Sequence, residues 1–306
     1  MTKTICPDFL DQSYQMLLEG RVFPGISHLS ASLRYVRDTS NADDWNQFCL
    51  EECPCHPIHH LLQQDPFTNH SFRRPRGYAG DAELMDIIYQ RMPISSDTPT
   101  LGRSVYDFCM NASMLQSVRA RRVALSATLD AIADKTMKPR VLSVACGHLR
   151  EIEFSYAVQN GKIEVLTAFD QDERSLAEVR RCTRDLNVET IEGSVRDLLD
   201  GSVAFESYDF IYSAGLYDYL LAPTARRLTT QLFEFLRTGG TLLLANFLPA
   251  LRDAGYMEAF MRWPLVYRTA EEMDSLACCI PKSALSRREC FYDPPGCVVF
   301  LELTKR

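Results

Sequence analysis

Residues 141–151 combine a strand-forming run with a turn of small side chains, a pattern that could hold a nucleoside close to the backbone. Val141 to Val144 are strand formers, and the turn Ala145-Cys146-Gly147 that follows would let a ligand approach closely. A second apolar run follows and ends at Asp170. In a nucleoside-binding βαβ unit, an acid in this place accepts hydrogen bonds from the ribose hydroxyls. The spacing therefore predicts such a unit, with Asp170 on the ribose.

The turn has one glycine, Gly147, whereas a dinucleotide site needs Gly-x-Gly-x-x-Gly to seat a pyrophosphate on the helix N-terminus. Pyrophosphate binding is therefore not expected. The layout resembles motif I of class I S-adenosylmethionine-dependent methyltransferases, whose cofactor has no phosphate. That family usually has an acid in the place of Ser143 and glycines in the places of Ala145 and Leu149. On this motif alone, an ordinary buried strand and turn of an α/β domain stays an alternative.

Later segments follow the order expected for that family. Further strands are predicted at residues 187–192, 208–213, 241–245, 290–292 and 297–303. Gly239-Gly240 is expected to stop a helix and turn the chain into a strand, and Asp293-Pro-Pro-Gly296 to turn a closing hairpin. The resemblance covers residues 140–306. It implies a Rossmann-like α/β fold with a parallel sheet and an antiparallel C-terminal hairpin.

The first 138 residues show helical spacing of apolar side chains and no clear strand periodicity. We therefore expect two domains, a helical cap or substrate region at 1–138 and an S-adenosylmethionine-binding domain at 139–306. Ligands bind at the carboxyl ends of the strands in doubly wound sheets, so the helical region is expected to cover that edge.

An unusual loop in the N-terminal region, Arg76-Gly-Tyr-Ala-Gly-Asp81, combines flexible glycines with charged and aromatic side chains. Asp81 could cap the helix that follows, and the loop could equally be a plain surface turn. Together with His56-Pro, Asp65-Pro-Phe-Thr and Phe169-Asp-Gln-Asp-Glu, the loop resembles a class I subgroup that includes bacterial enzymes making 3-hydroxy fatty acid methyl esters, the 3-hydroxypalmitic acid methyl ester type. The resemblance implies a small-molecule methyltransferase, with a carboxylate as the methyl acceptor.

The resemblance also implies which residues hold S-adenosyl-L-methionine. The glycine turn would approach the methionine part, the loop after the third strand would border the adenine, and the end of the fourth strand would face the sulfonium. The cofactor-binding residues expected on this basis are Ala145, Gly147, Glu151, Asp170, Gln171, Ser194, Val195, Arg196, Ser213, Ala214 and Gly215. Arg150 is an alternative to Glu151 at the amino-acid end.

Methyl transfer from a sulfonium is an in-line displacement, to which orientation alone can contribute roughly 7–11 kcal/mol. A carboxylate acceptor is already ionised at neutral pH and needs no base, but an arginine can hold it bidentately. Tyrosine rings can face a sulfonium cation, and a histidine could act as base for a hydroxyl or amine acceptor. The expected catalytic residues are Arg74, Arg76, Tyr78, Tyr106, His148, Tyr217 and Tyr219, with Arg73 as a further candidate.

Composition limits the other classes. The 306 residues carry a net charge of -7 with a pI near 5.5, so no nucleic-acid partner is expected. No apolar run reaches the length of a membrane span, and the start has no apolar signal core, so a cytoplasmic protein is expected. Eleven cysteines then indicate reduced thiols. A homodimer is left open.

Three further expectations complete the sequence-based interpretation. Cys53-Pro-Cys55-His56 lacks a second ligand pair at zinc-site spacing, so no metal is expected. Arg119, Arg121 and Arg122 are expected on a solvent-exposed helix face. The alternatives in function are a methyltransferase of another small biosynthetic metabolite, and a sensor that binds the cofactor without transferring its methyl group.

Overall fold

The computed structural model describes residues 8–203, 205 and 207–306, which form two compact units. The helical unit comprises residues up to Val118 together with Ala250–Pro264, and the sheet unit comprises Arg119–Pro249 and Leu265–Arg306. The division falls inside the long helix α9 (Ser113–Lys135), earlier than the expected domain boundary after residue 138. Residues 250–264, expected in the second domain, fold with the N-terminal residues instead.

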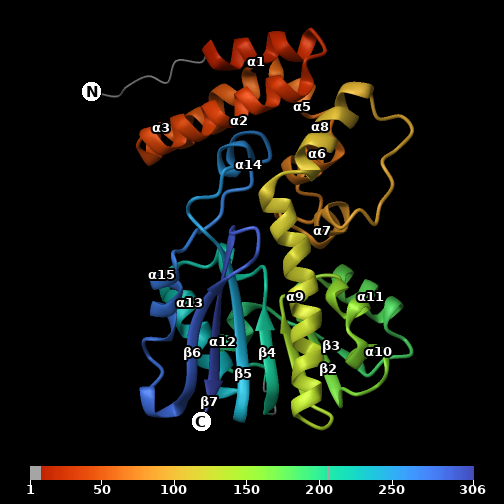
Figure 1. The fold of residues 1–306 in the computed structure, drawn as a ribbon, viewed down its shortest axis with the longest axis vertical. Helices are drawn as coiled ribbons and strands as arrows, with labels where there is room; N and C mark the ends of the chain where they lie inside the picture. The colour runs from red at the N-terminus through yellow and green to blue at the C-terminus, as the bar shows by residue number, and fades with distance from the viewer. Residues whose placement is uncertain (1–7, 204, 206) are drawn as a thin grey trace. The chain divides into compact units, whose positions relative to one another are not determined.

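The helical unit holds short and medium helices, with longer connections at residues 74–81 and 89–99. They are α1 (Asp8–Leu18), α2 (Val22–Thr39), α3 (Ala42–Gln47), the π-helix η1 (Phe48–Glu52), α4 (Cys53–Cys55), α5 (Ile58–Leu62), α6 (Pro66–Arg73), α7 (Ala82–Ile88), α8 (Thr100–Met110) and α14 (Ala254–Phe260). Figure 1 shows α1 lying along α2. Described residues before Arg140 form no strand, as the sequence predicts.

Helix α14 packs on α2 although more than two hundred residues separate them in the sequence. Glu258 of α14 accepts a hydrogen bond from Arg37 Nε at 2.9 Å and another from Trp45 Nε1 at 2.6 Å. A Cβ atom at Gly255 would lie 3.0 Å from the backbone carbonyl carbon of Leu33. The glycine therefore permits the close contact that brings residues 250–264 into the helical unit.

The sheet unit is built on seven strands in the order β3-β2-β1-β4-β5-β7-β6 (Figure 1). The strands are β1 (Arg140–Val144), β2 (Val165–Asp170), β3 (Val188–Glu192), β4 (Tyr208–Ser213), β5 (Leu236–Phe247), β6 (Leu285–Tyr292) and β7 (Val298–Lys305). Strands β1 to β5 pair in parallel, and β7 runs antiparallel to both β5 and β6. The Rossmann-like sheet and the closing hairpin predicted from the sequence are confirmed.

Helices surround this sheet. They are α10 (Tyr156–Gln159), α11 (Glu173–Cys182), α12 (Val195–Asp200), α13 (Ala222–Glu234) and α15 (Ala270–Asp274), with short 3-10 turns η2 (Arg150–Phe154), η3 (Tyr217–Tyr219), η4 (Ser275–Ala277) and η5 (Lys282–Ala284). Strands β1 and β2 are buried along nearly their whole length. Their continuous apolar runs are typical of parallel strands that are covered on both faces.

The strand order reverses at β1, which lies between β2 and β4. Chain connections leave in opposite directions at such a switch point, and a crevice forms beyond the carboxyl ends of the strands. The register aligns Val144 with Phe169 and Ser143 with Tyr212, so β1, β2 and β4 end at the same edge. The segments that follow these strands are therefore brought together.

One local expectation was wrong. Helix α13 ends at Glu234, and Gly239-Gly240 lie inside β5 instead of stopping the helix. The pairing of β4 with β5 shifts register here, and Gly239 has φ of 82°. A Cβ atom at Gly240 would lie 2.9 Å from the carbonyl oxygen of Tyr208. The glycines thus allow a bulged strand to pass its neighbour closely.

Candidate functional site

The turn after β1 is built from left-handed backbone conformations. Ala145, Gly147 and Leu149 have φ of 55°, 54° and 54°. This conformation costs an L-residue with a side chain roughly 1–2 kcal/mol, so Ala145 and Leu149 are strained where a glycine would not be. These are the two positions at which the resembling family usually has glycine. The chain thus adopts glycine-favoured backbone conformations at two positions that have side chains.

Asp170, the last residue of β2, holds this turn in place. Its carboxylate accepts hydrogen bonds from the backbone N–H of Gly147 at 2.8 Å and of Asp172 at 2.9 Å. The side chain is 6% exposed, and burial raises the pKa of its carboxyl group. An ionised carboxylate has about four acceptor positions, so the group can still accept bonds from a ligand. Two elements predicted to bind the cofactor are therefore in direct contact.

The other predicted strand-end residues lie at the same edge. Ser194 caps α12 in a capping box with Asp197, and Val195 and Arg196 are the first residues of that helix. Within this capping box, the Asp197 carboxylate accepts a hydrogen bond from the backbone N–H of Ser194. Ser213 Oγ donates to the carbonyl oxygen of Val144 at 2.9 Å and so ties the end of β4 to β1. Ala214 and Gly215 follow directly and are partly exposed, as is Asp172, while Gln171 is exposed.

Several charged side chains are buried in the sheet unit near this edge, and one of them, Arg150, pairs with Glu178 of α11. Five others are Asp170, Glu151, Asp218, Arg121 and Arg268, each less than 10% exposed. Glu151 accepts a 2.6 Å hydrogen bond from Tyr212 Oη, and burial raises the pKa of its carboxyl group despite this bond and the positive charge of Arg121. Burial of charges on this scale is costly, and functional sites are where such groups are commonly retained.

Asp218 is the third buried acid at this edge whose pKa is raised. It accepts a hydrogen bond from the backbone N–H of Phe247 at 2.8 Å. Burial raises the pKa of its carboxyl group to about 6, although Arg121 and Arg268 lie near enough to lower it. Arg268 also donates to the carbonyl oxygen of Tyr217 and thus supports the loop after β4.

Candidate catalytic residues of the sheet unit have different surroundings. Tyr217 is fully buried, and its hydroxyl is 3.1 Å from Thr229 Oγ1, so it packs in the core. Tyr219 is 40% exposed. His148 is 9% exposed and lies 3.5 Å from Arg150, whose guanidinium pairs with Glu178 at 2.7 Å. Arg150 is therefore engaged by α11, which favours Glu151 over Arg150 at the amino-acid end.

The remaining candidates belong to the helical unit. Arg73 ends α6, and Arg74 follows it with φ of 51° and donates to the carbonyl oxygen of Arg262. Arg76 is partly buried, with its side chain 7% exposed, and pairs with Glu83 at 2.8 Å. Tyr106 lies in α8, is 6% exposed and donates to the carbonyl oxygen of Ile87 at 3.5 Å.

The end of the Arg76–Asp81 loop contains one group of potential metal ligands among the described residues. His70, Asp81 and Glu83 have ligand atoms within 4.8 Å of one another. Asp81 caps α7 as expected, through Leu84 N at 2.8 Å, and it also contacts His70 Nε2 at 2.9 Å. Because Arg76 already pairs with Glu83, the group is explained as a capped loop end.

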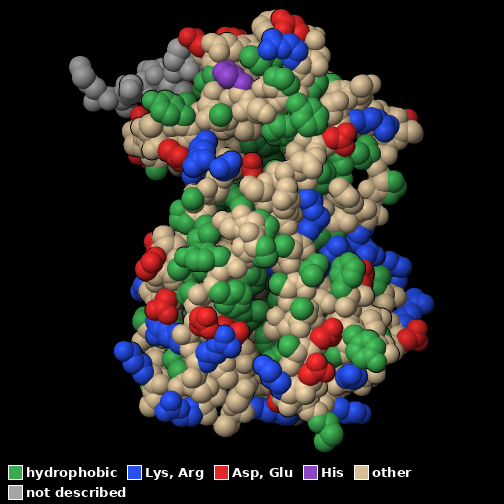
Figure 2. Space-filling view, viewed as in Figure 1, with side chains coloured by type: hydrophobic (Ala, Val, Ile, Leu, Met, Phe, Trp, Pro, Cys, Tyr) green, Lys and Arg blue, Asp and Glu red, His purple; other side chains and the backbone are tan. Residues whose placement is uncertain are grey.

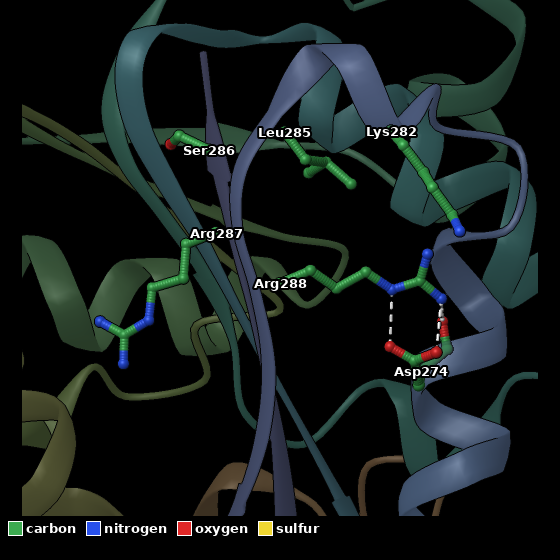
Figure 3. Close-up of a pocket in the computed structure, with 6 residues that line it drawn as sticks. All are labelled: Asp274, Lys282, Leu285, Ser286, Arg287 and Arg288. Atoms are coloured by element: carbon green, nitrogen blue, oxygen red, sulfur yellow. Dashed lines mark hydrogen bonds and ion pairs between the residues drawn. The ribbon is translucent and has the colours of Figure 1, made fainter.

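Figure 3 shows the residues that line a surface hollow in the sheet unit. It is lined by residues of η5, the start of β6 and Asp274, which pairs with Arg288. Leu285 pairs with Lys305, and the neighbouring Thr304 pairs with Thr241 in the first half of β5. The hollow therefore lies toward the amino ends of the parallel strands, opposite the edge where such sheets bind ligands.

Comparisons with known proteins agree with this geometry. A family model described as tellurite resistance protein TehB matches residues 118–253, less than half of the chain. A solved structure from Bordetella parapertussis, described as a possible exported protein, is 14% identical with a TM-score of 0.62, covering 88% of this chain and 98% of that one. No curated protein sequence matches.

Two methyltransferase structures are more distant neighbours. Magnesium protoporphyrin IX methyltransferase from Synechocystis PCC 6803, with bound SAH, is 10% identical with a TM-score of 0.49, covering 72% of this chain and 94% of that one. The N-methyltransferase NodS from Bradyrhizobium japonicum WM9 is 17% identical with a TM-score of 0.44, covering 62% and 97%.

The strand order and the closing hairpin define the fold. The sheet unit has the fold of the class I S-adenosylmethionine-dependent methyltransferases, with the antiparallel β7 that closes such sheets. Figure 2 shows Lys and Arg side chains among Asp and Glu side chains over its visible face. No helix among the described residues is long and apolar enough to cross a membrane.

Four residues of the site were not identified from the sequence, and one of them, Arg268, lies beyond β5 where no motif pointed to it. Arg121 was expected on an exposed face but is 7% exposed, while Tyr212 and Asp218 had no assigned role. Tyr212 and Asp218 could have been found from their positions at the end of β4 and just beyond it. For Arg121, the helical spacing gives no signal, because it does not say where α9 crosses the sheet.

Strain in the turn can be measured by replacing Ala145 with glycine. Ala145→Gly should raise the free energy of unfolding by up to about 1 kcal/mol, because the relief of left-handed strain exceeds the entropy that glycine adds to the unfolded chain. Ala124→Gly is the matched control, since Ala124 is exposed within α9 and should lose about 1 kcal/mol. Urea unfolding of both variants measures whether each change raises or lowers the free energy of unfolding. Destabilisation by both changes would contradict strain at Ala145.

The pKa of Asp218 predicts how stability depends on pH. Because the folded value of about 6 lies above the ordinary 3.8, its contribution to stability is present at pH 4 and lost as pH rises through 6. Asp218→Asn keeps an acceptor for Phe247 N–H but cannot ionise. Relative to wild type, the variant should therefore gain at most about 3 kcal/mol between pH 4 and pH 7. Urea unfolding across that range measures the difference. A pH-independent difference would show that Asp218 titrates normally.

Proposed function

We propose that this chain is an S-adenosyl-L-methionine-dependent methyltransferase that acts on a small molecule. The carrying observation is the contact between Asp170 and Gly147 at the switch point, where an acid at the end of β2 holds the turn after β1. This arrangement suits a nucleoside, with the ribose on Asp170 and the sulfur end toward the backbone after β4. The class I fold and the match to the TehB family model support the same function.

The residues of this edge fit the cofactor in chemistry. Asp170 supplies acceptor positions for the ribose diol, with Gln171 beside it, and Ser194, Val195 and Arg196 would border the adenine. Ala145 and Gly147 would approach the methionine part, and Ser213, Ala214 and Gly215 would place backbone carbonyl groups near the sulfonium. Bound S-adenosylmethionine supplies an electrophilic methyl group on a positively charged sulfur. The chain's own residues bind, orient and desolvate the reactants.

The acceptor that we propose is a carboxylic acid, such as a 3-hydroxy fatty acid. A carboxylate is ionised at neutral pH, so its oxygen can attack in line without a base, and the chain needs only to position it. Arg73, Arg74, Arg76 and Tyr78, together with Tyr106, Tyr219 and His148, remain candidates for contact with the acceptor. The second proposal is methyl transfer to a different small acceptor, such as an oxygen or nitrogen atom of another metabolite. Tellurite is included among the acceptors to be tested because the matching family model is described as tellurite resistance protein TehB.

Detection of S-adenosylhomocysteine tests the reaction. The protein is incubated with S-adenosylmethionine and a series of 3-hydroxy fatty acids, with the corresponding amides as non-ionising controls. We expect product with the acids and none with the amides. Product formed only with tellurite or with a metabolite extract would favour the second proposal. Binding of the cofactor without turnover in any mixture would indicate a sensor.

Replacement of Asp170 tests the cofactor site. Asp170→Asn should weaken S-adenosylhomocysteine binding by about 1–3 kcal/mol, because a hydrogen bond to a charged group is lost. Asp200→Asn is the matched control, since Asp200 is exposed at the end of α12 and its carboxylate accepts a hydrogen bond from Ser202 N–H. Calorimetry should find the affinity of the control within about twofold of wild type. Unchanged affinity of Asp170→Asn, with an intact fold, would remove Asp170 from the site.

The Arg76–Asp81 loop is proposed to contribute to catalysis. Tyr78→Ala and Arg76→Ala should lower turnover at least about tenfold, or roughly 1.4 kcal/mol in barrier, while the melting temperature falls by only a few degrees. Glu83→Gln is the control, because it removes the partner of Arg76 and keeps the arginine. If the loop only stabilises the helical unit, Tyr78→Ala and Arg76→Ala will melt much earlier yet keep their turnover per folded molecule.

A further inference from the structure

Arg121 has an unsatisfied donor in the interior of the protein. Its side chain is 7% exposed, and its Nη1 atom is buried with no hydrogen-bond partner among the described residues. Buried polar groups in native proteins are nearly always hydrogen-bonded, and a guanidinium offers five N–H donors in a rigid fork. A buried guanidinium with an open donor therefore points to a ligand that supplies an acceptor.

The guanidinium lies at the carboxyl edge of the sheet unit. Its Nη2 atom is 4.0 Å from the place where a Cβ of Gly215 would be, and its Cζ atom is 5.7 Å from the centre of the Phe247 ring. Gly215 follows β4, and Phe247 ends β5. Arg121 thus belongs to the same edge as the segments proposed to face the sulfonium.

Glu151 supplies the opposite charge close by. Arg121 lies near enough to lower the pKa of the Glu151 carboxyl group, which burial raises. One oxygen of Glu151 accepts from Tyr212 Oη at 2.6 Å, and a carboxylate has further acceptor positions. The turn after β1 therefore leads to the buried carboxyl group of Glu151, and helix α9 brings the buried guanidinium of Arg121 within electrostatic range of it.

We propose that Arg121 and Glu151 bind the amino-acid end of S-adenosylmethionine, Arg121 its α-carboxylate and Glu151 its α-ammonium group. This inference rests on the proposed function. A zwitterion presents one anionic and one cationic group side by side, and the arginine fork matches a carboxylate in geometry as well as charge. Both residues then act as positioning groups that fix the cofactor at the end remote from adenine.

Three ligands distinguish binding of the α-carboxylate from binding of the α-ammonium group. S-adenosylhomocysteine carries both charged groups, its decarboxylated analogue keeps only the ammonium, and 5′-methylthioadenosine lacks both. Calorimetry compares these ligands on wild type, Arg121→Gln, Arg121→Lys and Glu151→Gln. Arg237→Gln is the control for loss of an arginine, because Arg237 is 42% exposed and pairs with Asp209 near the amino end of β5.

We expect Arg121→Gln to weaken S-adenosylhomocysteine binding at least tenfold, equivalent to about 1.4 kcal/mol, and to leave the other two ligands within about twofold. The affinity of Arg121→Lys for S-adenosylhomocysteine should lie between those of wild type and Arg121→Gln, since lysine keeps the charge and lacks the guanidinium fork. Glu151→Gln should weaken both ligands that carry the ammonium and spare 5′-methylthioadenosine. Arg237→Gln should match wild type for all three ligands.

Other outcomes would contradict either the role of Arg121 or the proposed function as a whole. If Arg121→Gln and Arg121→Lys weaken all three ligands alike, or none, Arg121 does not bind the α-carboxylate. Equal weakening of all three ligands would indicate that Arg121 has a structural role. No weakening of any ligand would indicate that the open donor of Arg121 binds the carboxylate of the methyl acceptor instead. If wild type binds neither S-adenosylhomocysteine nor 5′-methylthioadenosine, the proposed function itself is overturned.

Discussion

The hydrogen bond from Gly147 N–H to the Asp170 carboxylate is the interaction on which the site depends. The turn after β1 needs left-handed conformations at Ala145 and Leu149, which non-glycine residues adopt only when their surroundings impose them. Asp170 imposes them from the neighbouring strand, in a register fixed by the pairing of Val144 with Phe169. The buried carboxylate loses hydration, and the N–H donors offset part of that loss. Strain in the turn and desolvation of the acid are thus coupled at one edge.

Much of the fold could be predicted from the sequence because the signals are local. Short apolar runs and the turn Asp293-Pro-Pro-Gly296 indicate strands and a hairpin within a few residues of where they form. Long-range packing was not visible in the same way. Residues 250–264 join the helical unit because Glu258 accepts hydrogen bonds from Arg37 and Trp45. No local sequence pattern predicts these distant partners. Gly239-Gly240 likewise fit a helix stop as well as a bulged strand until β4 is placed beside them.

The candidate site was predictable where topology alone positions a residue. In a parallel sheet, residues that follow the strands must share an edge, so Asp170 and Ser213 could be placed without coordinates. Burial of individual side chains could not be predicted. Tyr217 and Tyr219 are two positions apart, yet one is in the core and the other is 40% exposed. Arg121 similarly differs from a surface arginine only through the path of α9, which depends on how the helix packs.

The buried charges at this edge have a consequence for the kind of ligand that fits. Three carboxylates, on Asp170, Glu151 and Asp218, face two guanidinium groups, on Arg121 and Arg268, and the buried Arg150 is balanced by Glu178. The group therefore has an excess of one negative charge when all its members are ionised. Burial raises the pKa of all three acids, because removal from water disfavours the charged form of a carboxyl group. A nearby cation offsets part of that cost. A zwitterionic amino-acid group adds no net charge, whereas a sulfonium adds one positive charge and offsets the excess. Transfer of the methyl group removes that positive charge. For the proposed reaction, the electrostatics of the sheet unit therefore favour the methyl donor over the product that must leave.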